Sequence, residues 1–151
     1  RSAAKASEGS WRAPCNRCLS SQFLPSSHFS AAEIRASLVA GADLIVTSRG
    51  LSVDPDDVTR LGLPAAGAVD LVYGSPVLPG AMFASARIGE VPVLGVPACG
   101  MYHRITMLDL VLPRVLCGKM IDRDTLAQLG HGGLCRSCPT CRYPACDFGT
   151  T

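Results

Sequence analysis

The chain has 151 residues, enough for one domain with a modest hydrophobic core. Hydrophobic residues make up 48% and aromatic residues 5%, which favours an α/β domain over a β-sandwich or an aromatic-rich nucleic-acid binder. The net charge of +2 is too small to indicate a polyanionic partner, and no apolar run reaches the roughly 18 residues of a membrane span. Because the N-terminal residues lack the apolar segment of a signal peptide, we expect a soluble, cytoplasmic protein that binds neither nucleic acids nor membranes.

Three segments differ in composition. Residues 1–29 show no periodicity and are interpreted as an irregular leader, in which Cys15 and Cys18 supply only half of a metal site. Residues 30–130 alternate apolar runs with turn residues, which predicts an α/β domain. Residues 131–151 are rich in Gly and Cys and are predicted to form a metal-binding tail.

Helix and strand signals alternate within the predicted domain. A helix is expected over residues 30–40, because Ser30 and Glu33 form a capping-box pattern and Gly41 follows. The predicted strands cover residues 44–47, 69–73, 82–88 and 91–96. A short helix is expected to follow Asp57 and to end by Gly62. A longer helix should start near Met101, with a kink or an early stop at Pro113, and a last helix should run from its cap Asp122 through Leu129. This alternation predicts a three-layer αβα fold with a mostly parallel sheet.

The stretch over residues 43–57 joins a strand, a polar loop and a helix start. Asp54 is a candidate N-cap, Pro55 suits the first helical position, and Asp57 belongs to an acidic first turn. Open α/β sheets bind ligands at such places, because free backbone N–H groups of the helix N-terminus face the crevice. An ordinary, well-capped βα turn is the alternative interpretation.

Three motifs in order carry a family resemblance. They are residues 47–57 (Thr-Ser-Arg-Gly-Leu-Ser-Val-Asp-Pro-Asp-Asp), 73–80 (Tyr-Gly-Ser-Pro-Val-Leu-Pro-Gly) and 95–101 (Gly-Val-Pro-Ala-Cys-Gly-Met). Over about residues 31–129 the chain resembles the molybdopterin-binding fold shared by molybdopterin adenylyltransferases and molybdopterin molybdotransferases. The family pattern Thr-(Ser/Thr)-Gly-Gly-x-Ser-Val-x-x-x-Asp is matched at Thr47, Ser48, Gly50, Ser52, Val53 and Asp57.

The resemblance implies a transferase of molybdenum-cofactor biosynthesis. It would adenylylate molybdopterin or insert molybdate into the adenylylated form, with Asp57 as the catalytic acidic residue linked to a divalent cation such as Mg²⁺. The residues expected to bind the pterin are Thr47, Ser48, Gly50, Ser52, Asp54, Gly80, Pro97, Cys99 and Gly100. Family members commonly form dimers or trimers, so the resemblance also implies a homo-oligomer.

Departures from the family pattern favour an alternative. Arg49 replaces the second glycine of the first motif, and the lysine of the molybdotransferase loop Pro-Gly-Lys-Pro is Ala81 here. Residues 1–29 do not resemble the family's first strand. The alternative is a non-catalytic module that binds pterin or its cofactor and uses its cysteines as a redox or metal sensor. Cys99 lies before a predicted helix N-terminus, so it is either a reactive thiol or a small buried one.

The C-terminal segment holds four cysteines spaced C-x₂-C-x₂-C-x₄-C. The predicted metal ligands are Cys135, Cys138, Cys141 and Cys146, and a reducing cytosol disfavours disulfides between them. Four thiolates can hold one Zn²⁺ tetrahedrally or one [4Fe–4S] cluster, and the spacing leaves both open. A disordered thiol-rich tail and a zinc module for macromolecular partners are the alternatives, and His131 is a candidate substitute ligand.

Overall fold

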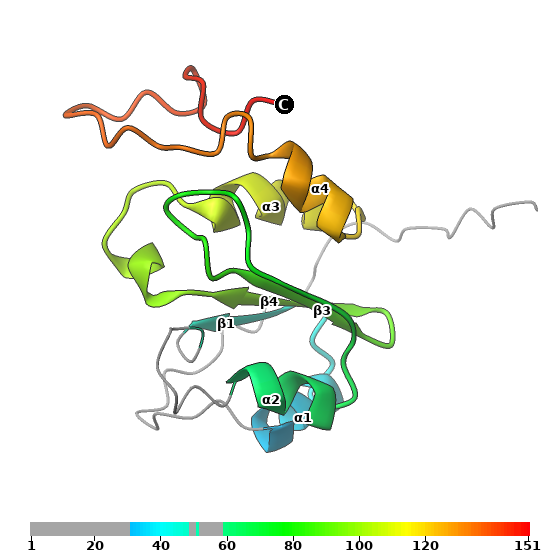
Figure 1. Cartoon of the computed structure of the whole chain (residues 1–151). Helices are drawn as coiled ribbons and strands as arrows, with labels where there is room; N and C mark the ends of the chain where they lie inside the picture. Colours follow the sequence, from blue (N-terminus) through cyan, green and yellow to red (C-terminus); the bar gives the residue numbers. More distant parts are fainter. Residues whose placement is uncertain (1–30, 49–50, 52–58) are drawn as a thin grey trace, which may run out of the picture.

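A computed structural model describes residues 31–48, 51 and 59–151 (Figure 1). In chain order its elements are α1 (Ala31–Val39), β1 (Ile45–Ser48), α2 (Thr59–Ala65), β2 (Val69–Tyr73), β3 (Ala84–Ile88), β4 (Val91–Val96), the 3₁₀ helix η1 (Ala98–Met101), α3 (Met107–Leu116) and α4 (Arg123–Gln128). The structure is therefore mixed α/β, and all four predicted strands are present. The predicted leader, residues 1–29, lies outside the described residues.

Two helices differ from their predicted bounds. α2 continues past Gly62 to Ala65, because the left-handed residue that closes it is Gly67, with φ of +92°. α3 begins at Met107 instead of near Met101, because Thr106 caps it. The Thr106 hydroxyl accepts from the Leu108 N–H at 3.2 Å, and the Asp109 carboxylate accepts from the Thr106 N–H at 2.7 Å.

The sheet contains one parallel pair and two antiparallel pairs. Its strand order is β1-β4-β3-β2, with β1 parallel to β4 and the other neighbours antiparallel. The prediction of a mostly parallel sheet is therefore wrong. The physical reason lies in the connections: β3 and β4 are joined by the tight turn at Gly89 and Glu90, and no helix crosses from β2 to β3. A parallel pair needs a connection of about a dozen residues or more. Among the three pairs of neighbouring strands in this sheet, only β1 and β4 are separated by so long a connection.

Hydrophobic clusters cover both faces of this sheet. Figure 1 shows α1 and α2 on one side, and α3, α4 and the C-terminal segment on the other. The cluster on the α1 side includes Ile34 and Val93, whereas the larger cluster on the α3 side includes Phe83, Leu94 and Phe148. Among the described residues, no helix combines the length and apolarity that crossing a bilayer requires.

Candidate functional site

Three loops that carry the family resemblance start from one edge of the sheet. The register aligns Thr47 of β1 with Gly95 of β4. It also aligns Gly95 with Ala84 of β3, and Ala84 with Tyr73 of β2. The carboxyl ends of β1, β2 and β4 therefore lie together with the amino end of β3, at an edge that we call the loop edge. The segments that follow β1, β2 and β4 all leave the sheet there.

The loop edge brings together several residues that the sequence predicts as pterin ligands. Thr47 and Ser48 end β1, and Pro97, Cys99 and Gly100 follow β4. Ser48 is exposed, Pro97 is buried, and the Cys99 thiol is free and half-buried. The remaining predicted residues of the first motif, namely Gly50, Ser52, Asp54 and Asp57, lie outside the described residues.

Thr47 carries an unsatisfied buried hydroxyl at this edge. The residue is 1% exposed, and its Oγ1 has no hydrogen-bond partner among the described residues. Beside it, Leu51 fills the space over Gly95 so closely that a Cβ at position 95 would collide with the leucine side chain. A buried polar atom without a partner costs about 1–3 kcal/mol, so such an atom in a folded protein commonly marks a position completed by something else.

Gly80 holds the loop between β2 and β3 against α3. It is buried with φ of +122°, and a Cβ at this position would collide with Met107. The neighbouring Pro79 carbonyl accepts a hydrogen bond from the Met107 N–H at 3.0 Å, and the Gly80 carbonyl accepts one from the Ser75 hydroxyl at 3.1 Å. The structure thus gives Gly80 a packing role, because only glycine permits this approach and this φ.

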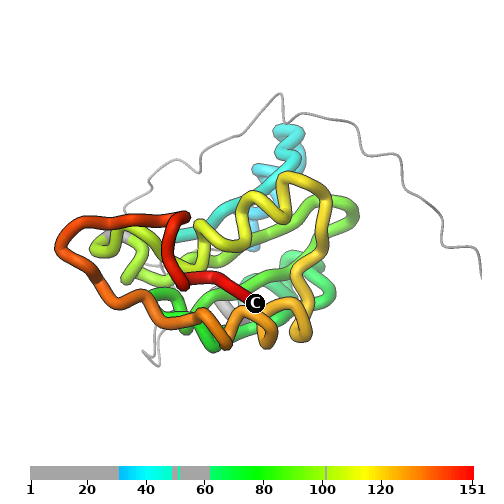
Figure 2. The backbone as a smooth tube through the Cα atoms, turned by 90° about the horizontal axis from the view of Figure 1, so that it is seen from above, coloured from blue at the N-terminus to red at the C-terminus, as the bar shows by residue number. Residues whose placement is uncertain are grey.

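The C-terminal segment packs onto the domain as a closed loop over residues 132–150, which we call the cysteine loop. Its two ends pair with each other: the Gly132 N–H donates to Thr150 and the Gly149 N–H donates to Gly132, at 3.1 and 2.9 Å. Phe148 is 7% exposed within the larger hydrophobic cluster and meets the Tyr143 ring edge to face, with centroids 6.4 Å apart. Figure 2 shows the loop, in orange and red, extending past the N-terminal end of α3 and then turning back toward the C-terminus.

The cysteine loop is also bonded to the loop between β2 and β3. The Leu78 N–H donates to the Gly133 carbonyl at 2.7 Å, and the Cys135 N–H donates to the Leu78 carbonyl at 2.8 Å. Leu78 and Leu134 accordingly form an isolated parallel bridge. Two motifs that lie more than fifty residues apart in sequence are therefore joined by backbone hydrogen bonds.

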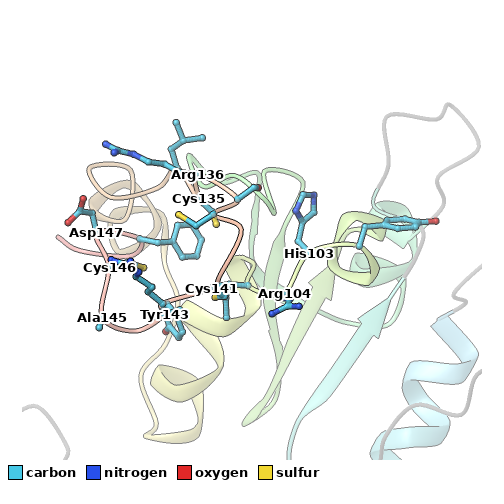
Figure 3. Close-up of a pocket in the computed structure, with 16 residues that line it drawn as sticks. His103, Arg104, Cys135, Arg136, Cys141, Tyr143, Ala145, Cys146 and Asp147 are labelled. Carbon is cyan, nitrogen blue, oxygen red and sulfur yellow. The ribbon is translucent and has the colours of Figure 1, made fainter.

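A cavity of about 450 Å³ separates the cysteine loop from the segment between η1 and α3. One wall consists of residues 102–105, and the other of residues 134–138, 141–143 and 145–148. All four predicted metal ligands, Cys135, Cys138, Cys141 and Cys146, line this cavity as free thiols. Figure 3 shows His103 and Arg104 on the first wall, and Cys135, Cys141 and Cys146 on the loop.

The charged residues around this cavity are mostly basic. Arg104, Arg136 and Arg142 line it together with one carboxylate, that of Asp147, and with His103. Within the described part of the chain, none of these three arginines forms a salt bridge. The cavity is therefore suited to a ligand or centre of negative charge.

The four cysteines share one cavity, but the described residues contain no group of three or more His, Cys, Asp or Glu side chains already placed to hold a metal ion. His131 is exposed and does not line the cavity. Sequence reasoning missed Arg136, Arg142 and Tyr143 as parts of this site. The available signal was adjacency, because each arginine directly follows a cysteine.

No protein-family model matches the chain, and no curated protein matches it. The functional interpretation therefore rests on the two features described above. They are the loop edge, where the Thr47 hydroxyl has no partner among the described residues, and the thiol-lined cavity.

Proposed function

We propose that this chain contains a molybdopterin-binding domain of molybdenum-cofactor biosynthesis, with a three-layer αβα architecture and the pterin held at the loop edge. The observation that supports the proposal is the alignment of Thr47 with Gly95, near the carboxyl end of β4. Because Thr47 and Gly95 begin the first and third motifs, the two motifs start next to each other in the sheet. The buried Thr47 hydroxyl, which lacks a partner among the described residues, supports a polar ligand there.

The chemistry of the edge suits a phosphorylated heterocycle. Loops that leave the carboxyl ends of parallel strands present backbone N–H groups, which favour phosphate. By resemblance, Asp57 is the proposed acid at a bound divalent cation such as Mg²⁺, which would neutralise phosphate charge when present. The reaction proposed is adenylylation of molybdopterin or molybdate insertion into the adenylylated form. The proposal includes a cytoplasmic location and a homo-oligomeric state.

A second candidate is a pterin-binding sensor without catalytic activity. The hydrogen bonds between Leu78 and the cysteine loop favour it, because they connect a thiol-rich segment directly to a loop of the proposed pterin site. The replacement of the family lysine by Ala81 is consistent with lost catalysis. Incubation of the full chain with molybdopterin, ATP and Mg²⁺, and separately with adenylylated molybdopterin and molybdate, separates the two candidates. An enzyme forms adenylylated pterin in the first mixture or consumes it in the second, whereas a sensor does neither.

Anaerobic calorimetric titration with molybdopterin tests the binding site itself. Thr47→Val removes the hydroxyl and keeps the side-chain shape, so we expect pterin affinity to fall by about tenfold for one lost ligand hydrogen bond. The free energy of unfolding should stay equal or rise, because the variant removes a buried polar atom that has no partner within the described part of the chain. Ser37→Ala, which removes a hydroxyl from α1, is the matched control and should bind like the wild type. Equal affinity in the wild type and Thr47→Val would reject this site.

A further inference from the structure

The four cysteines of the cysteine loop and the three arginines around them form the strongest feature that pterin binding leaves unexplained. All four thiols line the same cavity, although they are up to eleven positions apart in the sequence. Three of them, Cys138, Cys141 and Cys146, are exposed, so they contribute little to the hydrophobic core. Among the described residues no three of these thiols are yet close enough to share a metal ion, so binding requires the loop to close.

The loop is fixed at its base and lacks backbone pairing around Cys138 and Cys141, whereas the backbone N–H groups of Cys135 and Cys146 are hydrogen-bonded. Its ends are bonded through Gly132, Gly149 and Thr150, and Phe148 is anchored in the core. In contrast, among the described residues the backbone of residues 136–141 makes no hydrogen bond to any other backbone group. Cys138 and Cys141 can therefore move by a local rearrangement, while the fixed base keeps all four thiols around the cavity.

Ser137 lies between the first two cysteines of the loop and has φ of +49°, in the left-handed region that non-glycine residues rarely adopt. Residues 135–138 form neither a turn nor a bend, so bringing Cys135 and Cys138 to one ion needs a change in this segment.

The charge around the cavity complements a tetrathiolate centre. Four thiolates around one divalent ion carry a net charge of −2, which is costly unless positive groups lie nearby. Arg104, Arg136 and Arg142 provide three such groups, and none of them is paired with a carboxylate in the described part of the chain.

We propose that the cysteine loop closes around one Zn²⁺, bound by the thiolates of Cys135, Cys138, Cys141 and Cys146, with Arg104, Arg136 and Arg142 balancing the charge of the centre. Four Zn–S bonds form, and the four thiol protons pass to the solvent. Zinc fits better than an iron–sulfur cluster, because three ligands are exposed to solvent and the fourth cysteine comes one residue later than in the ferredoxin run. The proposal does not depend on pterin binding.

The test is an anaerobic titration of the reduced, metal-free full chain with Co²⁺, followed by displacement with Zn²⁺. We expect one Co²⁺ per chain, with the thiolate charge-transfer absorption and visible bands of a tetrahedral site, and loss of these bands when zinc is added. Cys138→Ser/Cys141→Ser should abolish the bands. Cys15→Ser/Cys18→Ser and Cys117→Ser are the matched controls, and each should retain the full spectrum.

The arginines are tested in the same titration. Arg136→Gln/Arg142→Gln should weaken metal affinity by about tenfold, with a smaller effect at high salt, because the groups act through charge. Arg114→Gln, on α3 outside the cavity, should leave affinity unchanged.

Three results would overturn the proposed zinc centre. They are full metal binding by the Cys138→Ser/Cys141→Ser variant, no metal binding by the wild type, or the presence of iron and sulfide in the purified protein. Circular dichroism shows whether each variant is folded. If the double variant is unfolded, Cys138→His replaces it, because imidazole can still bind zinc and should retain stoichiometric metal with weaker thiolate absorption. Zinc binding without pterin binding, or the reverse, distinguishes this proposal from the proposed function.

Discussion

Asp122 shows how one carboxylate fixes where a helix begins. Its Oδ1 accepts from the Thr125 N–H at 2.8 Å, as expected for the N-cap that the sequence predicts for α4. Hydrogen bonds from the Thr125 side chain and backbone lower the pKa of Asp122 below its ordinary value. The cap is therefore linked to pH.

The sign of this pH dependence follows from the lowered pKa. Folding favours the ionised form, so the contribution of Asp122 to stability is present above the unfolded-state pKa of about 3.9 and is lost as the pH falls through the folded-state pKa. We expect the difference in the free energy of unfolding between the wild type and Asp122→Asn to shrink between about pH 6 and about pH 2.5. Urea unfolding at each pH measures it. A difference that stays constant over this range would contradict the linkage.

At the scale of elements, α3 depends on the residue that precedes it. Apolar spacing from Met101 onward predicts a helix, yet the short 3₁₀ helix η1 ends at Met101 and the α-helix starts only after Thr106 forms its capping box with Asp109. Hydrophobic periodicity by itself cannot locate the start of a helix, because it reflects only the spacing of apolar side chains. The start also depends on which groups accept hydrogen bonds from the first backbone N–H groups of the helix. The delayed start leaves residues 102–105 as a wall of the cavity.

Removing this cap should destabilise the domain. Thr106→Ala deletes the hydroxyl that accepts from the Leu108 N–H, and we expect the free energy of unfolding to fall by about 1 kcal/mol. Thr106→Ser keeps the hydroxyl and should lose less than half of that amount. Chemical denaturation followed by circular dichroism compares the two variants. Equal losses would show that the Thr106 methyl group, and not the cap, is responsible.

At the scale of the whole molecule, the C-terminal segment shares the core of the domain. Phe148 belongs to the same hydrophobic cluster as Phe83 and Leu94, and a Cβ at Gly149 would collide with Leu110 of α3. The cavity therefore lies between two parts of one packed structure. Metal binding by the cysteine loop should consequently stabilise the whole domain, because its base is continuous with the core.

Phe148→Ala tests this integration. Losing a buried phenylalanine from a core costs about 3–5 kcal/mol, so we expect the whole domain to unfold at lower urea, with one transition. Phe148→Leu retains most of the buried volume and serves as the control. Unfolding of the sheet and helices is followed by far-ultraviolet circular dichroism. An unchanged transition in Phe148→Ala would mean that the cysteine loop folds independently of the domain.

The sequence by itself determined the local features of this protein. The positions of β1, β2 and β4 follow from short apolar runs rich in β-branched residues, whereas the residues of β3 give no clear strand signal. The Asp122 cap follows from a polar residue before a helical pattern, and the candidate ligands Cys135 to Cys146 follow from spacing alone. These signals are readable because each depends on neighbours within about ten residues along the chain.

Only the tertiary structure decided the rest. It set the antiparallel pairing of β2, β3 and β4, the common loop edge at Thr47 and Gly95, and the cavity between Arg104 and the cysteine loop. The sequence could not supply these, because strand direction follows from connection geometry, and the cavity joins segments that meet only when Phe148 and Leu94 bury their side chains in one core.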